Sequence, residues 1–126
     1  MKVVIETIPH DQHRYETVGD WWWERDYGED VLNIRVSKMS DWKKEMAVAE
    51  HEMSEALWCK AAGVEQMAVD EFDKKFEADR QEGDTREPGD QLDAPYYEGH
   101  QLGNEVEHLI FNSWNYADYE REVMSL

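Results

Sequence analysis

The segment that most constrains the fold is a long helical stretch with apolar residues on two of its sides. Over residues 41–62, six apolar residues recur at steps of three and four and so share one side of a helix: Trp42, Met46, Ala49, Met53, Ala56 and Leu57. Val48, Trp58 and Cys59 lie nearly opposite. A helix with two partly apolar sides is normally covered on both, so we expect other elements to pack against each of them.

This helix also carries the residues with the most specific chemistry, His51, Glu52 and Glu55. A histidine and a carboxylate four residues apart lie one above the other on a helix, so both can bind one cation. Glu52 projects part-way round the helix, where it could reach a water held by that cation. The spacing is that of the His-Glu-x-x-His zinc helix, with glutamate in place of the second histidine. We expect His51 and Glu55 to face an interior cleft.

A candidate third ligand, His100, lies on another amphipathic segment. A proline at position 95 is well tolerated in a first helical turn, so we predict a helix over residues 94–113. His100, Asn104 and Glu107 form a stripe at the edge of its apolar face. We predict that this face buries Leu102, Val106, Leu109, Ile110 and Trp114. Asn104 or Glu107 would then orient His100 as a metal ligand.

The hypothesis that follows is a catalytic metal centre. His51, Glu55 and His100 would supply two imidazoles and one carboxylate, the ligand set of many catalytic zinc sites. Zn²⁺, or another divalent transition metal, would lower the pKa of a bound water, and Glu52 would accept its proton. Two simpler interpretations stay open: His51 paired with a neighbouring carboxylate, and His100 in solvent.

Two further groups have weaker spacing signals. His10 and His13 could share a metal but lie in a polar loop, where a surface role is expected. Three carboxylates line one side of a later predicted helix and could bind Mg²⁺ or Mn²⁺, although a solvated face is the expected role: Asp70, Asp73 and Glu77.

The rest of the chain predicts a single α+β domain over residues 1–126, with a small antiparallel sheet of about three strands and about four helices. The strands are expected at 2–8, 20–24 and 31–37, the helices at 41–62, 64–80, 94–113 and 116–124, and a flexible acidic loop at about 81–93. Ser40 and Gly63 are the expected caps of the first helix.

Charge narrows the range of partners. The formal net charge of −17 disfavours direct binding to nucleic acid or to anionic membranes, and favours cations or basic proteins. No apolar run approaches the ~20 residues of a membrane span. The single cysteine, Cys59, cannot form an internal disulfide and suits a reducing compartment. We therefore expect a cytoplasmic location.

Two resemblances add to these inferences. The segment Ala49-Glu50-His51-Glu52-Met53-Ser54-Glu55-Ala56-Leu57, preceded by the strand at 31–36, resembles the core of a minimal zincin metallopeptidase, most closely the small soluble class of phages and mobile elements. This resemblance implies that His51 is the first zinc ligand and Glu52 the general base. Glu55 stands where that family has its second histidine.

The whole chain also resembles a group of small uncharacterised proteins encoded by bacteriophages and prophages. The resemblance is carried by Ile8-Pro9-His10, Arg14-Tyr15, Thr17-Val18-Gly19-Asp20-Trp21, Val69-Asp70-Glu71-Phe72-Asp73, Glu87-Pro88-Gly89-Asp90, Ala94-Pro95-Tyr96 and His100. It implies a role inside an infected bacterial cell. The leading functional hypothesis is a metal-dependent, zincin-like hydrolase, with a peptide as the candidate substrate. The alternative is a non-enzymatic acidic protein that binds and inhibits a basic host target, as a DNA mimic or in counter-defence, with the motif purely structural.

Overall fold

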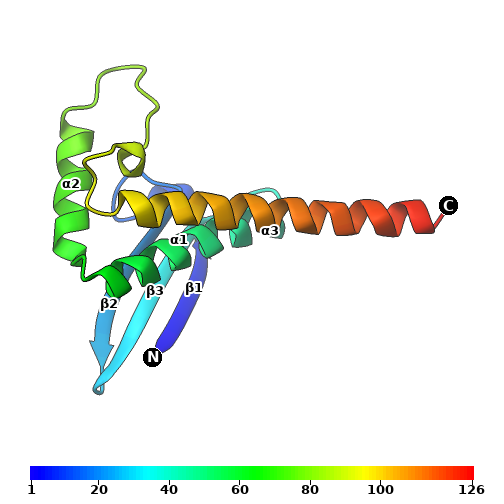
Figure 1. Cartoon of the computed structure of the whole chain (residues 1–126), viewed down its shortest axis with the longest axis horizontal. Coiled ribbons are helices and arrows are strands. Elements are labelled where there is room, and N and C mark those ends of the chain that lie inside the picture. The colour runs from blue at the N-terminus through cyan, green and yellow to red at the C-terminus, as the bar shows by residue number, and fades with distance from the viewer.

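A mixed three-stranded sheet, one helix packed on it and a second helix packed on the first make up the fold (Figure 1). The computed structural model describes all residues, 1–126. In chain order the elements are β1 (Lys2–Ile8), a 3₁₀ helix (His10–Gln12), β2 (Gly19–Asp26), β3 (Glu29–Ser37), α1 (Trp42–Ala62), α2 (Gln66–Ala78), a second 3₁₀ helix (Pro88–Asp90) and α3 (Tyr97–Met124). The α+β class is as predicted.

The sheet differs from the prediction in the direction of one strand. β2 and β3 form the expected antiparallel hairpin, but β1 pairs with β3 in parallel, and the strand order is β1-β3-β2. β3 takes the central position, where Leu32, Ile34 and Val36 are fully buried, and β1 lies along its other side. The connection between β1 and β2 therefore crosses the end of β3 instead of forming a tight turn.

α1 is the central helix, as its two apolar sides predicted. Asp41 caps its N-terminus by accepting a hydrogen bond from the backbone N–H of Lys43 at 2.9 Å, so the expected cap, Ser40, is wrong by one residue. Gly63 ends the helix at a φ of 75°, as expected. Ala49 and Ala56 pack on the sheet, in a core that also contains Trp21, Leu32, Ile34, Val36, Cys59 and Val69.

The number of helices is three, not about four. The helices predicted at 94–113 and 116–124 are one continuous helix of 28 residues, α3, because no glycine or proline interrupts the chain between them. The predicted apolar face of this helix is wrong in part: Val106, Ile110 and Trp114 are half-buried, but Leu102 and Leu109 are exposed. Leu109 is 72% exposed, whereas the residues buried against α1 are Gly99, His100 and Gly103.

The close approach of α3 to α1 depends on these glycines. A Cβ atom at Gly103 would lie 2.9 Å from both the ring Cγ and the backbone oxygen of His51. One at Gly99 would lie 2.8 Å from Cε3 of Trp58. The two helices therefore cross closely enough for side chains of α1 and α3 to share a single site.

No helix in the structure combines the length and the apolar character needed to cross a membrane.

We expect Gly103→Ala to destabilise the protein, although alanine favours a helix by about 1 kcal/mol over glycine. The new Cβ would clash with the backbone oxygen of His51, which cannot rotate away, and overpacking of this kind costs about 1–3 kcal/mol. Thermal unfolding measures the change, with the exposed Glu105→Ala on the same helix as the control. A Gly103→Ala protein more stable than wild type would contradict the close packing.

Candidate metal centre

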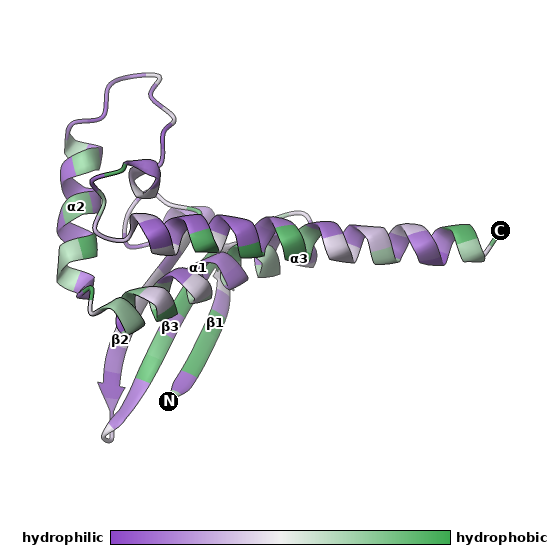
Figure 2. Cartoon of the chain, in the orientation of Figure 1, coloured by the Kyte–Doolittle hydropathy of each residue, from purple (hydrophilic) through white to green (hydrophobic).

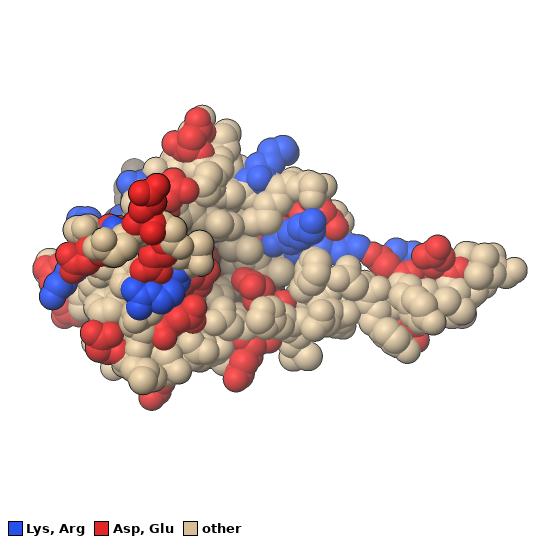
Figure 3. Space-filling model, turned by 90° about the horizontal axis from the view of Figure 1, so that it is seen from above, with Lys and Arg blue, Asp and Glu red and all other residues tan.

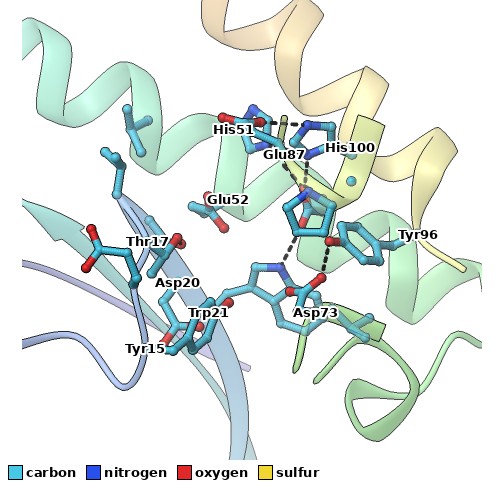
Figure 4. Close-up of a pocket in the computed structure, with 18 of the residues that line it drawn as sticks. Tyr15, Thr17, Asp20, Trp21, His51, Glu52, Asp73, Glu87, Tyr96 and His100 are labelled. Carbon is cyan, nitrogen blue, oxygen red and sulfur yellow. Dashed lines mark hydrogen bonds and ion pairs between the residues drawn. The ribbon is translucent and has the colours of Figure 1, made fainter. Parts of the chain in front are cut away.

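The three predicted ligands, His51, Glu55 and His100, meet at one point between α1 and α3. Figure 4 shows the rings of His51 and His100 side by side at this point. Nε2 of His51 lies 3.2 Å from Oε2 of Glu55 and 3.3 Å from Nδ1 of His100. Nδ1 of His100 lies 2.9 Å from the same Glu55 oxygen. All three side chains are buried. The convergence expected from the sequence is therefore present.

The size of this triangle matches a tetrahedral metal site. Zinc binds imidazole nitrogen and carboxylate oxygen at about 2.0–2.2 Å, so two ligand atoms of a tetrahedral site lie about 3.4 Å apart. The three edges here measure 2.9, 3.2 and 3.3 Å. A cation at the centre would need only a small outward movement of the ligands.

A second layer of carboxylates lies behind the two imidazoles. Oε1 of Glu107 is 3.6 Å from Nδ1 of His51, too far for a direct hydrogen bond. Nε2 of His100 lies 3.0 Å from Oε2 of Glu87 and 3.2 Å from Oδ1 of Asp90, which are ion-pair distances. The angles at Nε2 do not suit a hydrogen bond to either oxygen. When the two rings are neutral, negative charges in these positions favour a proton on each outer nitrogen, which would leave the inner lone pairs free for a cation.

The predicted orienting residues are only partly in place. Glu107 lies beside His51, although it was predicted to orient His100. Asn104 lines the cavity next to the site but makes no hydrogen bond to His100. The partners of His100 come instead from the segment predicted as a flexible acidic loop, part of which forms the second 3₁₀ helix. Gly89 allows this helix to lie on the ring, because a Cβ atom there would be 2.5 Å from Cγ of His100.

Burial and hydrogen bonds act in opposite directions on the charges of the centre. Burial favours the neutral carboxyl of Glu55, but the hydrogen bonds from His100, His51 and Trp21 outweigh it and lower the pKa to about 2. Burial likewise favours a neutral His100, but Glu55 and Glu87 raise the pKa of its ring to about 10. A positive charge is therefore stabilised at this point.

Glu52 is the fourth predicted site residue and lines the same cavity (Figure 4). Burial, followed by the negative charges of Glu55 and Asp20, raises its pKa well above the ordinary value. Gly19 on β2 makes room for the side chain, since a Cβ atom there would lie 2.6 Å from Oε1 of Glu52. Glu52 is thus a desolvated carboxyl that can bind a proton, as a general acid–base residue requires.

The cavity is about 430 Å³ in volume and is enclosed by α1, α2, α3, β2 and the loops at residues 10–18 and 85–89. Its wall is mainly polar, and carboxylates outnumber the two arginines that reach it, Arg80 and Arg86. A cavity of this size admits a side chain or a short segment of a larger molecule.

Several residues of the site were not identified from the sequence. The indole N–H of Trp21 donates to Oε1 of Glu55 at 3.0 Å. The hydroxyl of Tyr96 donates to Asp73, which is buried in the cavity wall, so the expectation of a solvated face for α2 is wrong at this position. Hydropathy could not reveal these residues, because Trp21 and Tyr96 have the same pattern as ordinary core aromatics.

His10 and His13 lie outside the centre. Nδ1 of His10 and Nε2 of His13 both contact the hydroxyl of Ser37, at 2.8 and 2.9 Å. These contacts attach the loop after β1 to the end of β3, a structural role that the expected surface role did not include.

Comparisons with models of known protein families, with curated proteins and with solved structures found no match for this chain. The function is therefore argued from the site alone.

Asp73→Asn should make the protein more stable than wild type, increasingly so as the pH rises. Burial, opposed by the Tyr96 hydrogen bond and reinforced by nearby acids, raises the pKa of Asp73 to about 7. Between about pH 4 and 7 the unfolded chain ionises Asp73 while the folded protein does not, so wild type loses stability over this range. Asparagine has no such charge and can still accept the hydrogen bond from Tyr96.

The melting temperatures of the two proteins should coincide near pH 4, diverge up to about pH 7 and then differ by a constant amount. The corresponding difference in the free energy of unfolding grows by about 1.4 kcal/mol for each pH unit between these limits. The exposed Asp79→Asn at the end of the same helix serves as the control. A difference between Asp73→Asn and wild type that did not change with pH would show that Asp73 ionises freely in the folded protein.

Proposed function

We propose that this protein is a metal-dependent hydrolase in which His51, Glu55 and His100 bind one divalent transition-metal ion, such as Zn²⁺, and Glu52 acts as the general base. The observation that supports this most strongly is the contact of two imidazole nitrogens and one carboxylate oxygen around one point, at 2.9–3.3 Å. With ring protons on the outer nitrogens, these atoms repel one another unless a cation lies between them.

A proton can meet this requirement as well as a metal can. The protonated ring of His100 would donate to Glu55 and leave His51 as a neutral neighbour, which gives the buried polar network that is the simplest alternative. The arrangement as a whole favours a metal, because each imidazole has a carboxylate behind it and the cavity gives access to the site.

The bound metal would supply Lewis acidity, which polarises a substrate carbonyl and lowers the pKa of water. Glu52 would accept a proton from the attacking water at its carboxylate and pass it to the leaving group. Its raised pKa suits this exchange, because a carboxyl that binds a proton more readily than usual can accept one from water and then donate it. Glu107 and Glu87 would keep the imidazole lone pairs directed at the metal.

A peptide bond is the proposed substrate class. β3 is followed by a short connection and then by α1, which carries the His-Glu-x-x-Glu sequence. This order of elements resembles a zincin core. The resemblance to phage proteins further suggests that the enzyme acts inside an infected bacterium. The rival function, inhibition of a basic host protein, is supported by net charge, but the face in Figure 3 carries both signs of charge rather than an unbroken acidic surface.

Metal binding is tested by adding zinc to metal-free protein and measuring stoichiometry and thermal stability. We expect one ion per chain and a higher melting temperature, because a ligand that binds only the folded state stabilises it. His51→Ala and His100→Ala should lose both effects, whereas His108→Ala, an exposed histidine on α3, should keep them. Zinc that binds without any loss in the His51 and His100 variants would place the metal elsewhere.

The role of Glu52 is tested with Glu52→Gln, which keeps the shape of the side chain but cannot accept a proton. This variant should bind one zinc ion as wild type does and lose about 10²–10⁴-fold in peptide hydrolysis. Glu98→Gln, an exposed glutamate on α3, should retain full activity. Hydrolysis unaffected by Glu52→Gln would contradict the mechanism, and zinc-loaded wild type that cleaves no member of a peptide library would contradict the proposed substrate class.

A further inference from the structure

The strand β1 lies at an edge of the sheet and has no partner on its outer side. It pairs only with β3, so its outward-facing backbone N–H and C=O groups meet no other strand. β1 is seven residues long and contains no proline or bulge. A long regular edge strand without such protection is a template for pairing with another strand.

The side chains of β1 on the helix-covered face are also uncovered. Val3 and Ile5 lie opposite Leu32 and Ile34 of β3, which are fully buried beneath α1. Val3 and Ile5 are nevertheless 40% and 41% exposed, because α1 packs on β2 and β3 and stops short of β1. Figure 2 shows this strip of apolar residues along β1 at the open side of the sheet.

The sequence of β1 is complementary to itself in an antiparallel arrangement. If two copies pair with Val4 opposite Val4, Lys2 of each copy faces Glu6 of the other, and Val3 faces Ile5. Residues directly opposite in an antiparallel pair share a face of the sheet, so this register joins opposite charges on one face and apolar residues on the other. The neighbouring register, with Ile5 opposite Ile5, would instead set Val4 against Glu6.

The C-terminal part of α3 extends on the same side of the molecule. Residues 109–124 project beyond the sheet past β1 (Figure 1). Trp114 and Asp118 in this part of the helix contact Trp42 and Lys43 in the first turn of α1. Leu109, Tyr116 and Val123 are exposed and recur every seven residues, so they line one side of α3. A second copy that approached along β1 would also meet this projecting part of the helix.

We propose that the protein is a homodimer in which two β1 strands pair antiparallel about Val4 and join the two three-stranded sheets into one continuous sheet. The edge supplies the backbone hydrogen bonds, Val3 and Ile5 of both copies form a shared apolar cluster, and the projecting part of α3 from each copy extends over the other. This proposal is independent of the metal centre.

The first test is the solution mass of wild type by sedimentation equilibrium, which should be twice the 15.0 kDa of the chain. Lys2→Glu and Glu6→Lys should each weaken the dimer by about tenfold or more, because each replaces two cross-strand ion pairs by two like-charge contacts. Glu6→Lys also disrupts the pair with Arg35 at 3.9 Å, so the single variants alone do not decide the question.

Mixing the two single variants does decide it. In a mixed pair, the two acidic side chains at positions 2 and 6 of the Lys2→Glu chain would face the two basic side chains at positions 6 and 2 of the Glu6→Lys chain. The mixture should therefore form a heterodimer as stable as the wild-type dimer or more so. Lys74→Glu and Glu71→Lys, exposed charge reversals on α2, should leave dimerisation unchanged and serve as controls.

Three results would overturn the proposal: a wild-type monomer at every concentration up to its solubility limit, a dimer insensitive to the charges at positions 2 and 6, or single variants that fail to associate when mixed.

Discussion

Two imidazole nitrogens and a carboxylate oxygen held in contact inside a protein need a positive charge, a proton or a metal ion, to stabilise them, and much of this structure serves to maintain that contact. His51 and Glu55 come from α1 and His100 from α3, so the helices must approach closely and in one register. Gly103 makes this approach possible beside His51, while Gly89 in the second 3₁₀ helix and Gly19 in β2 leave room for His100 and Glu52. A side chain at any of them would occupy the space of a site residue.

The need for a positive charge at the centre accounts for part of the acidic composition. Glu87, Asp90 and Glu107 surround the two imidazoles, and Glu52 and Asp73 line the cavity in front of them. These negative charges favour a cation at the centre. Burial, reinforced by neighbouring carboxylates, raises the pKa of Glu52 and of Asp73. Part of the net charge of −17 is therefore concentrated around one site, where it has a chemical use.

The site was more predictable from the sequence than the packing was. Helical spacing placed His51 and Glu55 together, and the two apolar sides of α1 placed them in the interior, because both inferences depend on local geometry. The parallel β1, the continuous α3 and the role of Gly103 depend on contacts between distant segments, which periodicity cannot show. Leu109 illustrates this point, since it has the spacing of a core residue but is exposed, although Trp114 further along α3 packs on Trp42 of α1. Glu87 and Asp90 were missed for a related reason: a short polar segment with proline and glycine has the composition of a flexible loop, and only the burial of Gly89 against His100 shows that it belongs to the site.

The most direct measurement is an anomalous difference map from crystals grown with zinc, with data collected on both sides of the zinc absorption edge. The account predicts one peak about 2.0–2.2 Å from Nε2 of His51, Nδ1 of His100 and a carboxylate oxygen of Glu55. A map with no peak at that point, and with Nδ1 of His100 still in direct contact with Glu55, would show that a proton and not a metal holds the three residues together.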